Sequence, residues 1–178
     1  VKSDGSTDGW GDYTGPIKIK DKGIVVYARG QDSAEVWSNT SHKQITNIDN
    51  EGPSIKVTAD LENAKQKVGI KVEVTDDVRV GSVAWDKGIR GESYFDGKGN
   101  VIPNNSVFYV TENGYYTVYA SDSVGNKSTY TINVENIDSE APIVDIEVTP
   151  NDTVTTEVKI DIEYGDSSLK QYKIGTSN

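Results

Sequence analysis

The chain has 178 residues, of which 34% are hydrophobic, and it contains 17 Gly, five Pro and no Cys. This lean composition suits one domain or two small ones with many turns, and the lack of Cys excludes disulfides and thiol-based metal or redox sites. The formal net charge of −10 argues against nucleic acid as a partner, and no stretch approaches the ~18 apolar residues of a membrane helix.

A repeated phrase organises the chain. Asn47–Pro53 and Asn136–Pro142 share the pattern Asn-Ile-Asp-x-Glu-x-Pro and lie 89 residues apart. A fixed spacing of this size is typical of a tandem array of similar units. We therefore predict the C-terminal half of one repeat over residues 1–49, a complete repeat over 50–138 and the N-terminal half of a further repeat over 139–178.

The first segment has the pattern expected for the second half of a repeat. Tyr13–Ile19 predicts a turn that leads into a strand, and Gly23–Ala28 parallels Gly114–Ala120 of the complete repeat. The chain begins with Val and contains no Met, so we expect it to be a piece of a longer protein in which a secretory signal would not be visible.

The complete repeat shows the alternation of apolar and polar residues that is typical of strands. The clearest strand runs from Val68 to Val74, and Asn113-Gly114 predicts a turn with a positive φ. In all, the pattern predicts seven short strands with turns at the spacing of a sandwich. The predicted fold is all-β, with tandem immunoglobulin-like β-sandwich repeats.

The last segment has the pattern expected for the first half of a repeat, with strands predicted at Ile143–Val148, around Val158–Ile162 and around Leu169–Ile174. A half sandwich has an open sheet edge and half a core, so it is not expected to be stable alone. Two explanations remain open. Either the halves belong to repeats that continue in a longer chain, or the tail of one molecule completes the head of the next.

Two phrases resemble bacterial immunoglobulin-like repeats. Asn113–Ser128 resembles their ending NG-x-YTV-x-A-x-D-x-x-GN, and Trp10–Ile17 with Val26–Arg29 resembles the same ending in a sister subtype. The resemblance implies a secreted or wall-attached protein of Gram-positive bacteria, in which such repeats act as stalks, spacers or adhesion modules. Glu35-Val36 stands where the family has Gly-Asn, so we expect the loop after Asp32 to differ.

Four residues are interpreted as structural. Tyr116 follows the Asn-Gly turn at the position of a tyrosine corner, and Trp85 alternates with Val83 as a core indole. Pro53 and Pro142 fix φ after the linkers and limit their swivel.

Acidic residues near the linkers predict a calcium site. In an immunoglobulin-like sandwich the first strand begins at the end of the sandwich where two acidic loops lie, and carboxylates with backbone carbonyls are the ligands of calcium. The alternative is that turns favour Asp and Asn for backbone reasons alone. The predicted residues are Asp49, Glu51, Asp76, Asp77, Asp122 and Asn126, with Asp138, Glu140 and Asp166 in the third unit.

Catalysis finds little support. His42 is the one His and has polar neighbours, and no Ser lies in a G-x-S-x-G motif, so we do not expect an enzyme. Trp10 and Trp37 lie among Gly and Ser and are candidates for stacking on sugar rings, although Trp10 is equally suited to anchoring its own loop.

The predicted function is a non-catalytic extracellular stalk or spacer of a bacterial surface or secreted protein, whose partners are the neighbouring repeats. The first alternative is an adhesion module that binds a host or cell-wall glycan. The second is a fibre-forming subunit that assembles head-to-tail through its split terminal repeats.

Overall fold

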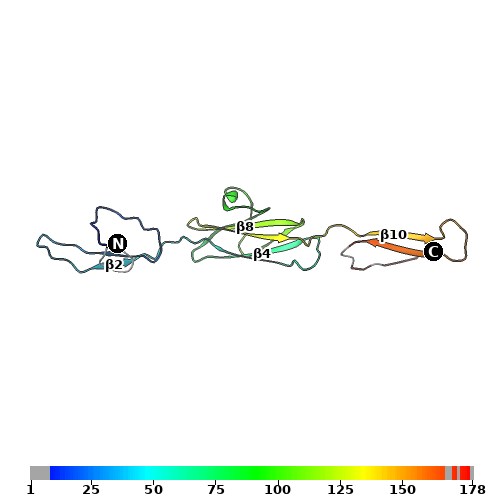
Figure 1. The fold of residues 1–178 in the computed structure, drawn as a ribbon, viewed down its shortest axis with the longest axis horizontal. Helices are drawn as coiled ribbons and strands as arrows, with labels where there is room; N and C mark the ends of the chain where they lie inside the picture. The colour runs from blue at the N-terminus through cyan, green and yellow to red at the C-terminus, as the bar shows by residue number, and fades with distance from the viewer. Residues whose placement is uncertain (1–8, 167–169, 172, 177–178) are drawn as a thin grey trace.

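The computed structural model describes residues 9–166, 170–171 and 173–176. Within this part the chain is all-β, built from antiparallel sheets and one short 3-10 helix. Three groups of strands follow one another along the long axis of the molecule: β1–β2, then β3–β9, then β10–β11 (Figure 1).

The middle group consists of two facing sheets, an arrangement consistent with a β-sandwich. The first sheet has the order β3-β4-β7, with β3 at Ser54–Ala59, β4 at Val68–Thr75 and β7 at Ser106–Val110. The second has the order β6-β5-β8-β9, with β5 at Val80–Lys87, β6 at Asn100–Val101, β8 at Gly114–Asp122 and β9 at Lys127–Val134.

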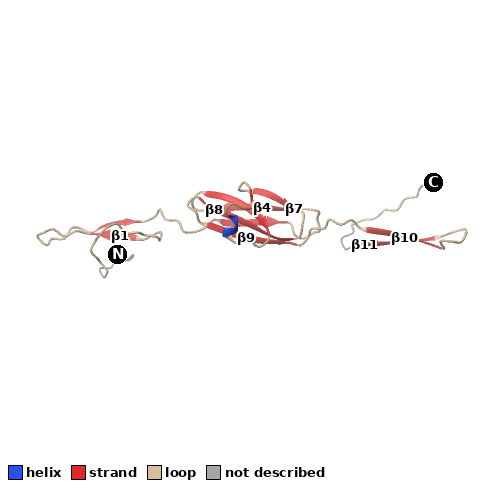
Figure 2. Ribbon diagram, turned by 90° about the horizontal axis from the view of Figure 1, so that it is seen from above, coloured by secondary structure: helices blue, strands red, loops and turns tan. Residues whose placement is uncertain are grey.

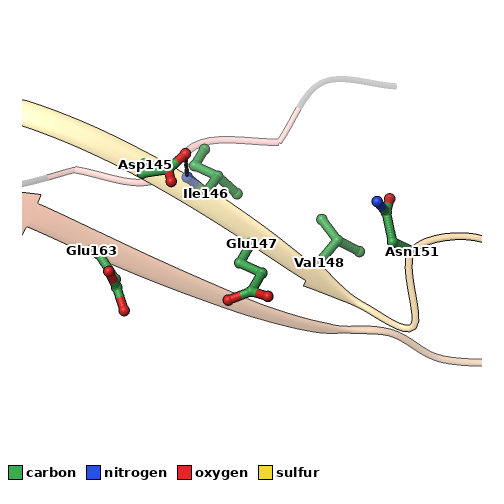
Figure 3. A pocket seen from close by; sticks show the side chains of 6 residues that line it. All are labelled: Asp145, Ile146, Glu147, Val148, Asn151 and Glu163. Atoms are coloured by element: carbon green, nitrogen blue, oxygen red, sulfur yellow. Dashed lines mark hydrogen bonds between the residues drawn. The ribbon is translucent and has the colours of Figure 1, made fainter.

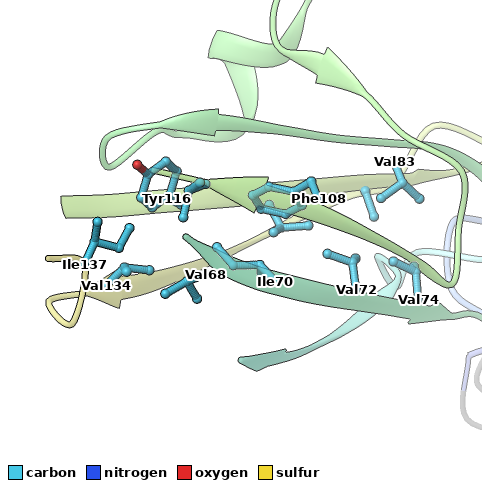
Figure 4. Packing of buried hydrophobic residues seen from close by; sticks show 12 residues of the cluster. Val68, Ile70, Val72, Val74, Val83, Phe108, Tyr116, Val134 and Ile137 are labelled. Carbon is cyan, nitrogen blue, oxygen red and sulfur yellow. The ribbon is translucent and has the colours of Figure 1, made fainter. Parts of the chain in front are cut away.

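The core of this group lies between the two sheets and follows from the alternation in the sequence. Val68, Ile70 and Val72 of β4 are fully buried, and they pack with Tyr116 and Val118 of β8 (Figure 4). Each such aliphatic side chain contributes about 1.5–3 kcal/mol when it leaves water. The strands are therefore held by one continuous apolar layer.

A second, smaller core covers the outer face of the second sheet. The 3-10 helix η1 (Glu92–Phe95) places the ring of Phe95 on that of Tyr119, with the ring centroids 4.9 Å apart. Gly99 has a φ of +88°, and a Cβ there would lie 2.8 Å from the Phe95 ring, so this close approach requires glycine. The glycine-rich loop is thus a folded cover.

The end groups are two-stranded sheets. β1 (Val25–Ala28) pairs with β2 (Ser41–Gln44), and β10 (Ile143–Thr149) pairs with β11 (Lys159–Gly165). The prediction of a strand at the end of the Tyr13–Ile19 turn is wrong, because none of the described residues before β1 forms a strand. The described residues after β11 also form no strand, and Leu169 and Tyr172 of the strand predicted there lie outside the described residues.

The last hairpin keeps the pairing of β3–β4, and one bridge of the first hairpin matches a pair of β8–β9. Val144 lies opposite Tyr164 and Ile146 opposite Ile162, as Ile55 lies opposite Val74 and Val57 opposite Val72. In the first hairpin, Gln31 bridges to Trp37 as Ser121 pairs with Lys127, and both members of the second pair lie 90 residues further on.

Candidate cation site at the first linker

The linker before β3 brings three carboxylates together. Asp49 precedes β3, Asp76 follows β4 and Asp122 ends β8, and one carboxylate oxygen of each lies within 4.8 Å of the other two. This is the one group of at least three acidic, His or Cys side chains with such spacing among the described residues. It contains three of the six residues predicted for the first calcium site.

Asp122 is held by its own loop. The residue is 5% exposed, and its Oδ1 accepts hydrogen bonds from the backbone N–H groups of Val124, Gly125 and Asn126 at 2.9, 2.6 and 2.9 Å. Burial raises the pKa of Asp122, but these bonds and the one from the Asn126 side chain outweigh it and hold the pKa below its ordinary value. The carboxylate is therefore charged at neutral pH.

Asp49 carries a carboxylate oxygen without a donor. Its Oδ1 accepts the backbone N–H of Glu51 at 3.1 Å, while its Oδ2 is buried and has no hydrogen-bond partner. A buried oxygen in this state costs free energy, and the nearby carboxylates of Asp76 and Asp122 add repulsion. Negative charge is therefore concentrated here, next to a carboxylate oxygen that accepts no hydrogen bond.

The donor set fits a hard cation. Calcium takes about six to eight oxygen ligands from carboxylates and carbonyls, and its coordination tolerates irregular geometry. The cluster offers only oxygen, and the chain has no Cys and one His. The orphan Oδ2 of Asp49 is the oxygen that a bound ion would satisfy.

The other predicted residues of the first site take different partners. Asp77 accepts a hydrogen bond from the Lys22 ammonium at 2.6 Å, and this contact raises the pKa of Lys22. The Asn126 amide donates to Asp122 Oδ2 at 2.7 Å and to the backbone oxygen of Asp49 at 3.3 Å, which joins the loop to the linker. Glu51 is not a member of the carboxylate group.

In the third unit the predicted acidic residues do not form such a group within the described residues. Asp138 Oδ1 accepts the N–H of Glu140 at 3.1 Å, as Asp49 does that of Glu51, and Asp166 follows β11 as Asp76 follows β4.

Trp10 and Trp37 meet on a residue that sequence reasoning missed. The guanidinium carbon of Arg29 lies 4.8 Å from the Trp10 ring centroid and 4.2 Å from that of Trp37. Both distances are those of cation–π contacts. Arg29 gave no signal because nothing in the sequence places it between two indoles that are 27 residues apart. The sugar-binding role of the two indoles stays a prediction.

The residues interpreted as structural lie as follows. The Tyr116 hydroxyl donates to the Glu112 carbonyl at 2.7 Å, and Trp85 stacks on Phe108 with 4.2 Å between ring centroids. Pro53 is fully buried, whereas Pro142 is exposed, so the two linkers differ in their packing.

The hairpin β10–β11 carries an open hollow. It is lined by Asp145, Ile146, Glu147, Val148, Asn151 and Glu163 (Figure 3). Its side chains alternate between the two faces of the strands, so the hollow does not enclose a ligand.

Comparison of the chain with protein-family models, curated proteins and solved structures gives no match. Over the described residues, the structure has no helix with the length and apolar character needed to cross a membrane.

Proposed function

We propose that the chain is part of an extracellular stalk or spacer of a bacterial surface or secreted protein, and that it has no catalytic role. The observation that supports this function is the serial arrangement of the strand groups along one axis (Figure 2). Each group contacts its neighbours through a short linker, which is the construction expected of a module that sets distance.

The first linker is fixed by contacts on both sides. Asn50 donates from its side-chain amide to the Lys20 carbonyl at 2.7 Å, which ties the linker to the first segment. On the other side, Gly52 lies so close to β9 that a Cβ would be 2.4 Å from the Lys127 carbonyl oxygen. The buried Pro53 follows directly. These contacts support a linker that resists bending.

The second linker is joined to the complete repeat. Lys65 donates its N–H to the Asn136 carbonyl and accepts the N–H of Asp138, both at 2.9 Å. The Asn113 side chain accepts the N–H of Ile137 and donates to its carbonyl, each at 2.8 Å. The chain therefore leaves the repeat in a defined direction.

We also propose that Asp49, Asp76 and Asp122 hold a calcium ion. Two observations support this proposal. One carboxylate oxygen of each of the three residues lies within 4.8 Å of the other two, and Oδ2 of Asp49 is buried with no hydrogen-bond partner. A bound ion would link the loops after β4 and β8 to the linker. It would stiffen the joint on which the spacer function depends.

Small-angle scattering tests the spacer function. At low concentration we expect an elongated particle whose radius of gyration is well above the ~16 Å of a compact domain of this length. A radius near that compact value would show that the groups fold onto each other, and the spacer proposal would be wrong.

Thermal melting tests the calcium proposal. Calcium at a hundredfold excess over its dissociation constant should stabilise the repeat by about 2.7 kcal/mol relative to chelator, which raises the melting temperature by about 10–20 °C. Asp49→Asn should abolish the increase, and Asp152→Asn, at an exposed position, should keep it. Equal melting temperatures with calcium and with chelator would remove the proposal.

A further inference from the structure

Two indoles and one guanidinium lie together at the surface of the first segment. Arg29 directly follows β1 and contacts the rings of both Trp10 and Trp37. Trp37 is 51% exposed and Arg29 is also exposed, so the contacts do not belong to a core. A cation that touches two aromatic faces is attracted by both and loses freedom to move. Arg29 is therefore held in place at an exposed position.

The N–H groups of Arg29 have no acceptor among the described residues, in contrast to those of Arg90. The guanidinium carbon of Arg90 lies 4.4 Å from the Tyr94 ring centroid, but Arg90 also donates from Nε to the Lys87 carbonyl at 3.1 Å and pairs with Asp86 at 3.6 Å. In the described part of the chain Arg29 has its two ring contacts and no hydrogen bond or ion pair. Its planar fork of donors is therefore available to a carboxylate of a ligand.

The backbone around Trp37 is ordered by the hairpin. Gln31 bridges to Trp37, and Ser38 donates its N–H to the Gly30 carbonyl at 2.8 Å while its hydroxyl accepts the N–H of Gly30 at 3.0 Å. A Cβ on Gly30 would meet nothing within 4 Å, so the space beside this residue is open. A surface that is ordered before a ligand arrives avoids part of the entropic cost of binding.

An open hollow of about 400 Å³ lies at Trp37. Ligand sites usually measure about 300–1,000 Å³ and combine apolar rings with a few polar groups. This hollow combines the indole with polar side chains, and its lining consists of Gly30, Gln31, Asp32, Val36, Trp37 and Ser38. A sugar ring has an apolar C–H face and hydroxyl groups at its rim, so it suits such a lining. Because the hollow is open, it suits one part of a longer sugar chain.

The charge of the first segment favours an anionic ligand here over the rest of the molecule. Residues 9–46 carry five basic and four acidic side chains, a net charge of +1, whereas the whole chain has a net charge of −10. An anionic polymer is repelled by the acidic remainder of the molecule and is not repelled by this segment.

We propose that Trp10, Arg29 and Trp37 bind a polysaccharide whose sugar rings carry carboxylates. The indole of Trp37 stacks on a sugar ring, Arg29 donates to a carboxylate, and Trp10 holds Arg29 in position. An acidic peptide supplies the carboxylate but lacks the flat C–H face for the indole. This binding goes beyond the spacer function and depends neither on that function nor on the cation site.

Nuclear magnetic resonance of the unchanged, ¹⁵N-labelled chain tests the proposal. The chain has three Trp, each with one indole N–H signal. The probes are hexasaccharides of galacturonate, of guluronate and of hyaluronan. We expect at least one of them to shift the Trp10 and Trp37 signals to saturation and to leave that of Trp85, which stacks on Phe108. Stationary Trp10 and Trp37 signals with all three probes would overturn the proposal.

The methyl ester of the hexasaccharide that binds separates charge from stacking, because it keeps the sugar rings and removes the negative charge. We expect the ester to bind about tenfold more weakly than the acid, as the loss of one charged hydrogen bond implies. Arg29→Gln should remove most of this difference. Lys18→Gln, which removes another exposed positive charge of the segment, should keep it. Equal affinity of acid and ester for the unchanged protein would overturn the recognition of a carboxylate.

Replacement of the exposed ring tests the stacking. Trp37→Ala should weaken binding about tenfold or more, and Trp37→Phe, which keeps a smaller ring, should bind with intermediate affinity. Tyr109→Ala is the matched control, because Tyr109 is an exposed ring that contacts Lys67 elsewhere on the molecule, and it should leave binding unchanged. The backbone amide signals of β1 and β2 show in each variant whether the hairpin is kept. Hexaglutamate that shifts the indole signals as strongly as the sugar acids would show that charge alone is recognised, and the polysaccharide proposal would be wrong.

Discussion

Tyr116 shows how one side chain holds the turn before β8. Its hydroxyl donates to Glu112 four residues earlier, and its ring is buried in the core. Tyr116→Phe keeps the ring and loses the bond, so we expect the free energy of unfolding to fall by about 1 kcal/mol. The melting temperature should drop by about 4–8 °C. Tyr115→Phe, at a half-exposed neighbour, should leave it unchanged, and equal effects would show that the hydroxyl is not the cause.

Asp122 makes the stability of its loop depend on pH. Its folded pKa lies below the ordinary value, so the stabilisation is complete above about pH 4 and is lost as the pH falls through the folded pKa. Asp122→Asn cannot be protonated in this range. We expect its melting temperature to fall less than that of the unchanged protein between about pH 5 and about pH 3. Parallel slopes in the two melting series would contradict this assignment.

The loop between β1 and β2 differs in part from the loop after Asp122, because the N–H of Glu35 donates to the Asp32 carbonyl whereas that of Gly125 donates to Asp122 Oδ1. It was expected to differ from the loop after Asp122, yet Asp32 Oδ1 accepts the N–H groups of Ala34 and Val36 at 2.9 Å as Asp122 Oδ1 accepts those of Val124 and Asn126. Glu35 and Gly125 both have a positive φ, of +65° and +102°.

Replacing Glu35 with glycine should therefore stabilise the loop between β1 and β2. A left-handed conformation costs a residue with a side chain about 1–2 kcal/mol, and glycine avoids this cost. In Glu35→Gly we expect the amide of Val36 to exchange with solvent at least about fivefold more slowly, as measured by hydrogen exchange. Ala34→Gly is the matched control and should not slow exchange. Equal slowing of exchange in both variants would show that the effect does not come from the positive φ of Glu35.

Local patterns determine which elements the sequence can predict. The alternation of Val68, Ile70, Val72 and Val74 marks β4 because all four face one core. The turn predicted at Tyr13–Ile19 leads into no strand before β1 among the described residues. The counterpart of this segment, β7, pairs with β4, and the described part of the first segment has no such partner. The cover around Phe95 was missed because its glycine-rich sequence has no period.

At the scale of the whole molecule, the topology of the predicted sandwich indicated where the carboxylates would lie close together. It placed Asp49 beside the loops of Asp76 and Asp122, because a linker and two loops meet at one end of a sandwich. It could not exclude Glu51 or Asp77, since the choice depends on side-chain direction and on the contact of Asp77 with Lys22. The contact of Arg29 with Trp10 and Trp37 also depends on the three-dimensional fold, so the sequence could not predict it.

The two hydrogen bonds between Asn113 and Ile137 also affect the deamidation of Asn113. Asn-Gly is the dipeptide whose side-chain amide is most readily attacked by the following backbone nitrogen, and the product of hydrolysis carries a carboxylate. At Asn113 that change would replace the donor facing the Ile137 carbonyl with an acceptor. The bonds that anchor the second linker thus also restrain the Asn113 amide from cyclising.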